Sequence, residues 1–203
     1  MNNLIQAGTP LSKAQKAAIL IHGRGASAES ILSLKDHLNL EGFALLAPQA
    51  EGNTWYPYSF MAPDESNEKS FQKSLRVIQD AYDLIVENGI QPAEIYFIGF
   101  SQGACLSLDF AARNAQEYGG VIAFTGGLIG ESLKKENYSG NFEGTPIFIG
   151  SSERDFHVPA ERIEASADLL RKMDAEVTVS LFSDPQHTIR QEEIDWVNNH
   201  ILS

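Results

Sequence analysis

Cysteine is nearly absent from this sequence. The 203 residues include one cysteine, Cys105, so the chain cannot form an internal disulfide. Cys105 lies in a stretch of small and apolar residues, where we expect it to be buried as a small hydrophobic side chain. A chain of this length is sufficient for a substantial core, and it contains no repeat, low-complexity tract or linker. We therefore predict a single domain over residues 1–203.

Basic residues are scarce as well: 15 Lys and Arg stand against 27 Asp and Glu, and the formal net charge is −12. Nucleic acids and anionic membranes bind basic patches, so we expect neither nucleic-acid binding nor stable membrane association. No apolar run approaches the length that spans a bilayer, and residues 1–6 lack a basic region followed by a long apolar one. These absences favour a cytoplasmic protein.

Metal-binding motifs are missing too. The five histidines form neither H-E-x-x-H nor a comparable ligand spacing, so we expect no metal site. With 43% hydrophobic and 21% charged residues, the composition is that of an ordinary globular protein. We expect no cofactor.

Apolar, strand-like runs recur along the chain with helical patterns between them. Ser27 is a candidate N-cap for a helix that carries Ile31, Leu34 and Leu38, and a second helix is predicted over 68–88, ended by Gly89. Strands that alternate with helices indicate an α/β fold, with a mostly parallel sheet covered by helices on both faces. The predicted strands are 17–21, 43–47, 95–100, 121–125, 146–150 and 177–182.

The most informative motif is G-x-S-x-G at residues 99–103, with Ser101 at its centre. It follows an apolar strand-like run and precedes a small-residue helical stretch at 104–112. A serine on such a strand-to-helix turn has strained backbone angles, and glycine on either side avoids steric collisions. The helix N-terminus next to the serine favours negative charge. We predict that Ser101 is a nucleophile.

A serine nucleophile needs a base and an acid, and in α/β hydrolases these follow in the order Ser, Asp or Glu, His. Three histidines lie downstream. His187, in a polar turn between a strand and the last helix, is the predicted base. His157 is the alternative, with a role lining or packing its loop, and His200 is expected to be a solvated residue at the helix end.

Asp155 is the predicted acid, because it lies just past a buried strand and can approach the histidine from a neighbouring strand end. Asp184 and Glu153 are the alternatives. A helix-capping or turn aspartate is the structural interpretation of Asp155. The candidate residues all follow predicted strand ends, which lie at one edge of a parallel sheet and form active sites there.

The oxyanion hole is predicted to come from backbone N–H groups. The residue after the nucleophile, Gln102, supplies one, and Arg24 in the His22-Gly23-Arg24-Gly25 loop supplies the other. His22 is expected to be structural, with its ring bonded to the loop backbone. Two interpretations of the Arg24 side chain stay open: it is solvated, or it faces an anionic or polar group on the substrate.

Substrate-binding residues are predicted in two segments. Aromatic residues gather in residues 52–67, where Trp55 and Tyr56 are expected to form a pocket wall or a short lid. The alternative is that the aromatics only pack this segment onto the body. In the glycine-rich stretch 126–130, Leu128 and Ile129 are candidates to line an acyl pocket.

These motifs resemble the small carboxylesterase/phospholipase family of α/β hydrolases, which includes acyl-protein thioesterases and lysophospholipases. The resemblance implies an α/β-hydrolase fold without a large cap domain, the triad Ser101, Asp155 and His187, and the oxyanion donors Arg24 and Gln102. Members similar to thioesterases carry an apolar residue at the position of Arg24 and often glycine at that of Ala104. Arg24 therefore points to the smaller bacterial esterase branch. The residues that carry the resemblance lie at 20–25, 47–50, 55–57, 99–103, 125–127, 146–150, 155, 158–159 and 187.

The predicted function is hydrolysis of short-to-medium acyl esters or thioesters of small molecules through an acyl-enzyme intermediate. Lysophospholipase or acyl-protein thioesterase activity is the alternative within the family, and an amidase or perhydrolase is the alternative on the same fold. A non-catalytic binding protein would need a broken triad. A homodimer is a possible assembly.

Overall fold

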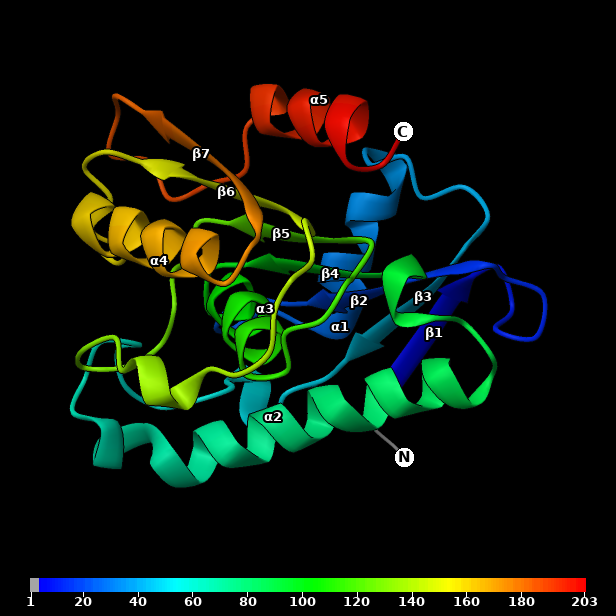
Figure 1. The fold of residues 1–203 in the computed structure, drawn as a ribbon, viewed down its shortest axis with the longest axis horizontal. Helices are drawn as coiled ribbons and strands as arrows, with labels where there is room; N and C mark the ends of the chain where they lie inside the picture. Colours follow the sequence, from blue (N-terminus) through cyan, green and yellow to red (C-terminus); the bar gives the residue numbers. More distant parts are fainter. Residues whose placement is uncertain (1–3) are drawn as a thin grey trace.

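The computed structural model describes residues 4–203; Met1–Asn3, which belong to the predicted domain and to the N-terminal segment discussed above, lie outside the described residues. The strands form one sheet of seven in the order β1-β3-β2-β4-β5-β6-β7 (Figure 1). Every neighbouring pair is parallel except β1 with β3. This confirms the predicted mostly parallel sheet. The strands are β1 (Leu4–Gly8), β2 (Lys16–Ile21), β3 (Phe43–Pro48), β4 (Ile95–Phe100), β5 (Gly120–Phe124), β6 (Pro146–Ser152) and β7 (Glu176–Phe182).

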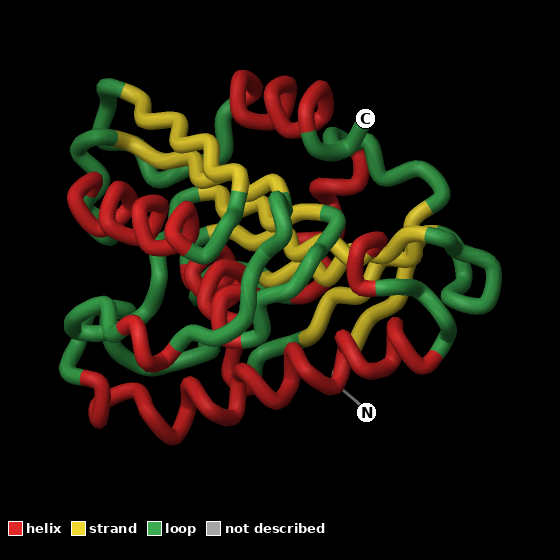
Figure 2. Tube along the Cα trace, viewed as in Figure 1, coloured by secondary structure: helices red, strands yellow, loops and turns green. Residues whose placement is uncertain are grey.

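Helices cover both faces of the sheet, so the core has two layers (Figure 2). Helices α2, α3 and α4 pack on one face, and α1 and α5 pack on the other. The side chains of the inner strands alternate between the two layers, as in Ile19 and Leu20 of β2, which explains why these inner strands are mostly apolar. The helices are α1 (Ala28–Leu32), α2 (Asp64–Glu87), α3 (Gln102–Arg113), α4 (Ala160–Lys172) and α5 (Gln191–His200).

The predicted helices are present with different lengths. Helix α2 begins at Asp64, four residues before the predicted start, directly after Pro63. It ends at Glu87 and is followed by Gly89 with φ of +90°. The helix after Ser27 is only five residues long and continues as a 3₁₀ turn over Ser33–Asp36. Within it the Ser33 hydroxyl donates to the Ser30 carbonyl, a local bond that competes with helical hydrogen bonds.

Strand β1 was not predicted. It pairs antiparallel with β3 at the edge of the sheet, and its residues are half-buried or exposed. Five residues without a clear apolar run leave little periodicity from which to predict a strand. The other six strands begin and end within two residues of their predicted bounds.

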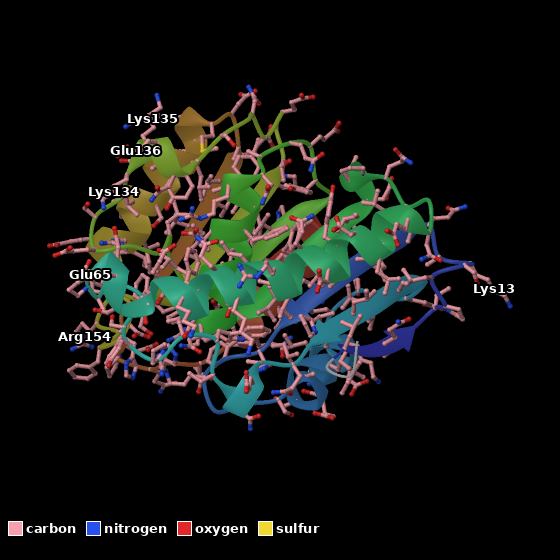
Figure 3. All side chains as sticks on the ribbon, turned by 90° about the horizontal axis from the view of Figure 1, so that it is seen from below. Lys13, Glu65, Lys134, Lys135, Glu136 and Arg154 are labelled. Atoms are coloured by element: carbon pink, nitrogen blue, oxygen red, sulfur yellow. The ribbon has the colours of Figure 1, made fainter. Side chains whose placement is uncertain are left out.

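Charged side chains cover the surface, with Lys134 and Glu136 at one end of the molecule and Lys13 at the opposite end (Figure 3). Helix α2 runs along one side of the molecule and is the longest helix of the described chain (Figure 1). None of the helices in residues 4–203 is long and apolar enough to cross a membrane. No large cap domain stands over the carboxyl edge of the sheet in this part of the chain.

Candidate active site

Ser101 occupies a strained turn between β4 and α3. Its φ of 55° and ψ of −117° lie outside the regions that a serine ordinarily adopts. The two motif glycines are sterically required: a Cβ on Gly99 would lie 2.2 Å from the Gly103 carbonyl oxygen, and one on Gly103 would lie 1.9 Å from the Ile21 carbonyl oxygen. The turn therefore exists only because both flanking positions lack a side chain.

Ser101, His187 and Asp155 form a continuous chain of hydrogen bonds. His187 Nε2 lies 2.8 Å from Ser101 Oγ, and His187 Nδ1 lies 2.7 Å from Asp155 Oδ2. The Asp155 side chain is fully buried, whereas a quarter of the His187 side chain is exposed. Asp155 Oδ1 accepts the backbone N–H groups of His157 and Val158 at 2.7 and 3.0 Å. Both carboxylate oxygens are therefore satisfied, and Oδ2 is oriented toward the imidazole.

The loop that carries His187 is held by a second aspartate. Asp184 accepts a hydrogen bond from Arg190 at 2.6 Å and one from the backbone N–H of Gln186 at 2.8 Å. The Ser152 hydroxyl lies in the same cluster, within hydrogen-bond distance of Asp184 and of the Gln186 carbonyl. The hydrogen bond from Arg190 is the main reason that the pKa of Asp184 lies below its ordinary value. Asp184, the alternative acid, therefore forms hydrogen bonds that hold the conformation of the His187 loop.

The two other downstream histidines lie in different surroundings. The ring of His157 stands edge-on to that of His187, with centroids 5.1 Å apart, and it borders the cavity at Ser101. His200 is exposed at the end of α5, where its ring stacks on Trp196 at 4.4 Å and its Nδ1 lies 2.8 Å from the Trp196 carbonyl oxygen. Of the two, only His157 is close enough to affect chemistry at Ser101.

A cavity of about 490 Å³ opens in front of Ser101 and His187. Its inner wall is apolar and is formed by Tyr56, Phe60 and Cys105. Two exposed aromatic side chains stand at its mouth, Tyr58 at 59% and Phe156 at 91% relative exposure. Phe156 was missed by the sequence analysis, although an aromatic residue directly after Asp155 was a visible signal.

The thiol of Cys105 lies in the wall of this cavity and is held in its protonated, unreactive form. Burial is the main cause that raises its pKa to about 12. Burial is likewise the first cause that raises the pKa of Tyr56, which borders the same cavity, well above its ordinary value. Cys105 is a buried, small side chain, as its apolar context predicted.

Four predicted substrate-binding residues divide between the cavity and the core. Tyr56 borders the cavity, but Trp55, Leu128 and Ile129 do not. Trp55 turns inward, and its indole N–H donates to the His22 carbonyl at 2.8 Å. The backbone N–H groups of Leu128 and Ile129 are bound by Ser166 and Asp109, which draws both side chains into the core. These three side chains lie in the core rather than along this cavity, because their segments are fixed by buried hydrogen bonds.

The loop after β2 lies against the nucleophile. A Cβ on Gly23 would lie 3.4 Å from the Ser101 Cβ, so the loop backbone passes close to the serine. The His22 ring is buried, with Nδ1 2.7 Å from the Gly23 carbonyl oxygen and Nε2 accepting the Ala50 N–H at 3.1 Å. Burial lowers the pKa of His22 below its ordinary value, which agrees with the structural role expected for it.

The side chains of Arg24 and Gln102 both bond to the aromatic loop, which we define as residues 54–63. Arg24 donates to the carbonyl oxygens of Pro57 and Tyr58 at 2.8 and 2.7 Å. Gln102 donates to the Tyr56 carbonyl at 2.8 Å and accepts the Trp55 N–H at 3.2 Å. Arg24 is exposed, as one of the two interpretations expected, but neither interpretation included its bonds to the aromatic loop. The aromatic loop is both packed onto the body and part of the cavity wall.

Within residues 4–203, no group of three or more His, Cys, Asp and Glu side chains is arranged to hold a metal ion. The site brings together the hydroxyl of Ser101, the imidazole of His187 and the carboxylate of Asp155. This is the combination that activates a serine for attack on an acyl carbon.

Comparisons with known proteins point in one direction. Residues 3–203 match the model of the phospholipase/carboxylesterase family. A solved structure of a phospholipase/carboxylesterase from Dyadobacter fermentans is 46% identical, with a TM-score of 0.98, over 99% of this chain and 96% of that chain.

Curated relatives are more distant. Acyl-protein thioesterase 1 of Saccharomyces cerevisiae is 32% identical over 61% of this chain and 52% of its own length. Acyl-protein thioesterase 1 of Kluyveromyces lactis is 27% identical over 78% of each chain. The chain thus spans about half the length of the first of these relatives and about three quarters of the second.

Proposed function

This chain belongs to the phospholipase/carboxylesterase family, and from that membership we propose that it is a serine carboxylic-ester hydrolase. Its substrates are small-molecule esters or thioesters with short-to-medium acyl groups. Ser101 is the nucleophile, His187 the base, Asp155 the acid that orients His187, and the N–H groups of Arg24 and Gln102 bind the oxyanion.

One observation carries the proposal: the chain of hydrogen bonds from Ser101 through His187 to Asp155. Its two distances, 2.8 and 2.7 Å, are those at which a proton moves between heavy atoms. A buried Asp155 beside Nδ1 favours the tautomer that has its proton on Nδ1 and leaves Nε2 free to accept. The nucleophile also lies at the N-terminus of a twelve-residue helix, where negative charge is stabilised.

In the first half of the reaction, Ser101 Oγ bonds to the acyl carbon as its proton moves to His187 Nε2. The carbonyl oxygen becomes an oxyanion and accepts hydrogen bonds from the two backbone N–H groups. The bond from the acyl carbon to the leaving oxygen or sulfur then breaks, and His187 returns its proton to that atom. The alcohol or thiol leaves, and the acyl group remains on Ser101.

In the second half, a water molecule takes the place of the leaving group. His187 accepts one of its protons as the water oxygen bonds to the acyl carbon. The collapse of this second oxyanion breaks the bond to Ser101 Oγ, which takes the proton back from His187. A carboxylic acid is released, and the enzyme is restored.

The cavity supports short-to-medium acyl groups as substrates. Its volume of about 490 Å³ is partly open to solvent, and Tyr56, Phe60 and Cys105 close its inner end. These walls are apolar, so they favour a hydrocarbon chain over a charged group. Relatives named acyl-protein thioesterase support thioesters as a second class of acyl donor, because both bonds are cleaved by the same steps.

The test is hydrolysis of para-nitrophenyl esters from acetate to palmitate, by the unchanged protein and by Ser101→Ala. We expect turnover of the short and medium esters and a fall of about 10³-fold or more in Ser101→Ala. Ser66→Ala, on the exposed face of α2, is the matched control and retains full activity. A fluorophosphonate labels Ser101 in the unchanged protein and the control only.

Other outcomes point to other functions. Rates that keep rising for acyl chains longer than about ten carbons contradict the short-to-medium assignment. Each added methylene would then still be buried, which means that the inner wall does not limit the length of the acyl chain. Anilide cleavage that exceeds ester cleavage indicates an amidase. Inert esters, thioesters and anilides together with no labelling of Ser101 exclude a hydrolase and leave a binding protein.

A further inference from the structure

Arg24 and Gln102 come from distant parts of the chain, yet their side chains bind consecutive residues of the aromatic loop. Gln102 binds the N–H of Trp55 and the carbonyl of Tyr56. Arg24 binds the carbonyls of the next two residues, Pro57 and Tyr58. The two residues whose backbone N–H groups are the proposed oxyanion donors therefore use their side chains to hold a single stretch of four residues.

The side-chain amide of Gln102 is buried, and both of its polar atoms form hydrogen bonds with the aromatic loop. Only 6% of Gln102 is exposed, and each of its amide atoms has a main-chain partner in the aromatic loop. Removing such a partner leaves a buried amide group unsatisfied, which destabilises the folded state. The side chain is therefore held firmly, and its own peptide N–H, at the first residue of α3, is held with it.

The Arg24 guanidinium binds carbonyl groups of the aromatic loop and has no carboxylate partner among the described residues. Among residues 4–203 no carboxylate lies within ion-pair distance of Arg24, and its two donor contacts are the carbonyls at 2.8 and 2.7 Å. Two parallel N–H bonds from one planar group fix its orientation as well as its position. These bonds constrain the side chain of Arg24 from its far end.

Two further bonds complete the connection, one donated in each direction, and the first of them reaches Asn53, the residue directly before the aromatic loop. The Gly25 N–H donates to the Asn53 carbonyl at 2.7 Å, and the Trp55 indole N–H donates to the His22 carbonyl at 2.8 Å. The peptide of Arg24 thus lies between two anchored residues, Gly25 on one side and His22 on the other. The loop after β2 and the aromatic loop form one hydrogen-bonded unit beside Ser101.

We propose that Arg24 and Gln102 are positioning residues, whose side chains use the aromatic loop to keep both oxyanion N–H groups aimed at the reacting carbonyl. The inference rests on the proposed ester hydrolase function. Donors that are fixed before reaction stabilise the transition state most, because no reorganisation is needed as charge develops. A displacement of about 1 Å at such a site lowers the rate by about 10²-fold.

The test replaces each side chain and keeps its backbone N–H. Gln102→Met retains side-chain length and Arg24→Met retains an unbranched apolar stem, and both remove the polar bonds. Arg24→Lys restores one donor group. With para-nitrophenyl butyrate we expect kcat to fall about 10- to 100-fold in both Met variants, with KM changed less than about threefold. Arg24→Lys recovers part of the loss.

A second readout separates positioning from general loosening. Ser101 Oγ adds to the carbonyl carbon of an alkyl trifluoromethyl ketone, and the proton of the Ser101 hydroxyl moves to His187. The adduct carries an oxyanion at the same place as the transition state of ester hydrolysis. We expect its affinity to fall by the same factor as kcat/KM in each variant. Because both side chains hold one loop, the double Met variant loses less than the product of the single losses.

Two matched controls remove comparable groups far from the site. Arg171→Met removes an exposed guanidinium of α4 that donates to the Val177 carbonyl of β7. Gln116→Met removes a half-buried amide bonded to two tyrosine hydroxyls. Both controls retain the kcat and ketone affinity of the unchanged protein. Thermal melting of every variant shows that rates are compared well below unfolding.

The inference is overturned if Ser101→Ala is inactive while Arg24→Met and Gln102→Met keep the unchanged kcat. It is also overturned if Arg24→Met raises KM alone, because Arg24 then binds substrate. An unchanged protein that neither cleaves esters nor reacts with a fluorophosphonate contradicts the proposed function itself, and the inference falls with it. Parallel loss of kcat and ketone affinity with partial recovery in Arg24→Lys supports it.

Discussion

Asp155 and His187 are 32 residues apart in the chain, yet Oδ2 of one lies 2.7 Å from Nδ1 of the other. The aspartate is fully buried, and its second oxygen is occupied by two backbone N–H groups. The pair therefore has one geometry available, in which Nε2 of His187 faces Ser101.

We predict that Asp155→Asn lowers kcat for para-nitrophenyl butyrate by about 10⁴-fold, because an amide N–H facing Nδ1 favours the wrong imidazole tautomer. Asp184→Asn, the alternative acid, lowers kcat by about tenfold or less, since it affects the His187 loop only indirectly. Steady-state kinetics of the two variants side by side provide the measurement. Equal losses in both would contradict the assignment of the acid.

The Asp184 carboxylate is expected to make stability depend on acid. Its pKa lies below the ordinary value of 3.8, chiefly because of its hydrogen bond with Arg190. The folded protein then binds fewer protons than the unfolded chain, so this contribution is present above about pH 4 and is lost as the pH falls through the lowered pKa. Urea unfolding should show Asp184→Asn less stable than the unchanged protein at neutral pH.

The same comparison at low pH provides the check. The stability difference between the two proteins should shrink as the pH is lowered through and below 3.8. Asp168→Asn, an exposed aspartate paired with Arg171 on α4, is a control far from the His187 loop. A difference between Asp184→Asn and the unchanged protein that stays constant with pH would show that Asp184 contributes through shape rather than charge.

Cys105 should be inert toward thiol reagents in the folded protein. Its pKa of about 12 leaves a thiolate fraction on the order of 10⁻⁴ at about pH 8, and its side chain is buried. We expect slow reaction with a chromogenic disulfide until guanidinium unfolds the chain, and one equivalent of thiol afterwards. Cys105→Ala is the blank. Rapid reaction of the folded protein would mean that the cavity wall opens frequently.

Phe156 offers a substitution that separates binding from stability. Because it is 91% exposed, Phe156→Ser should change the free energy of unfolding by less than about 0.5 kcal/mol. At the cavity mouth its ring can cover part of an acyl chain, so KM for the hexanoate ester should rise roughly 3- to 10-fold with kcat unchanged. Val86→Ser, an exposed apolar position on α2, should leave KM unchanged.

Much of the architecture was predictable because strand ends carry positional information. Ser101, Asp155 and His187 each follow an apolar run, and the carboxyl ends of parallel strands meet at one edge, so their proximity could be expected. The structure brings the three side chains into hydrogen-bond contact. Their roles in catalysis stay a prediction that the variants above address.

Some residues that were predicted to line the pocket have side chains that turn into the core instead. They lie in loops, where position along the chain does not reveal the direction of a side chain. Leu128 and Trp55 are near the correct edge of the sheet, but a loop has no period from which to infer which way a side chain turns. Their directions depend on buried bonds that the Leu128 backbone donates to Ser166 and the Trp55 indole donates to His22, partners far away in sequence. The contact of Arg24 with the aromatic loop escaped prediction for the same reason.

The bonds from Arg24 and Gln102 reach main-chain atoms only: one N–H and three carbonyls of the aromatic loop. Such bonds do not depend on which side chains the loop carries. The exposed Tyr58 side chain can therefore be exchanged, by natural drift or in a designed library, while the scaffold that supports it is preserved. If the proposed function holds, changes of side chain in this loop alter substrate preference while the bonds proposed to support the catalytic rate remain.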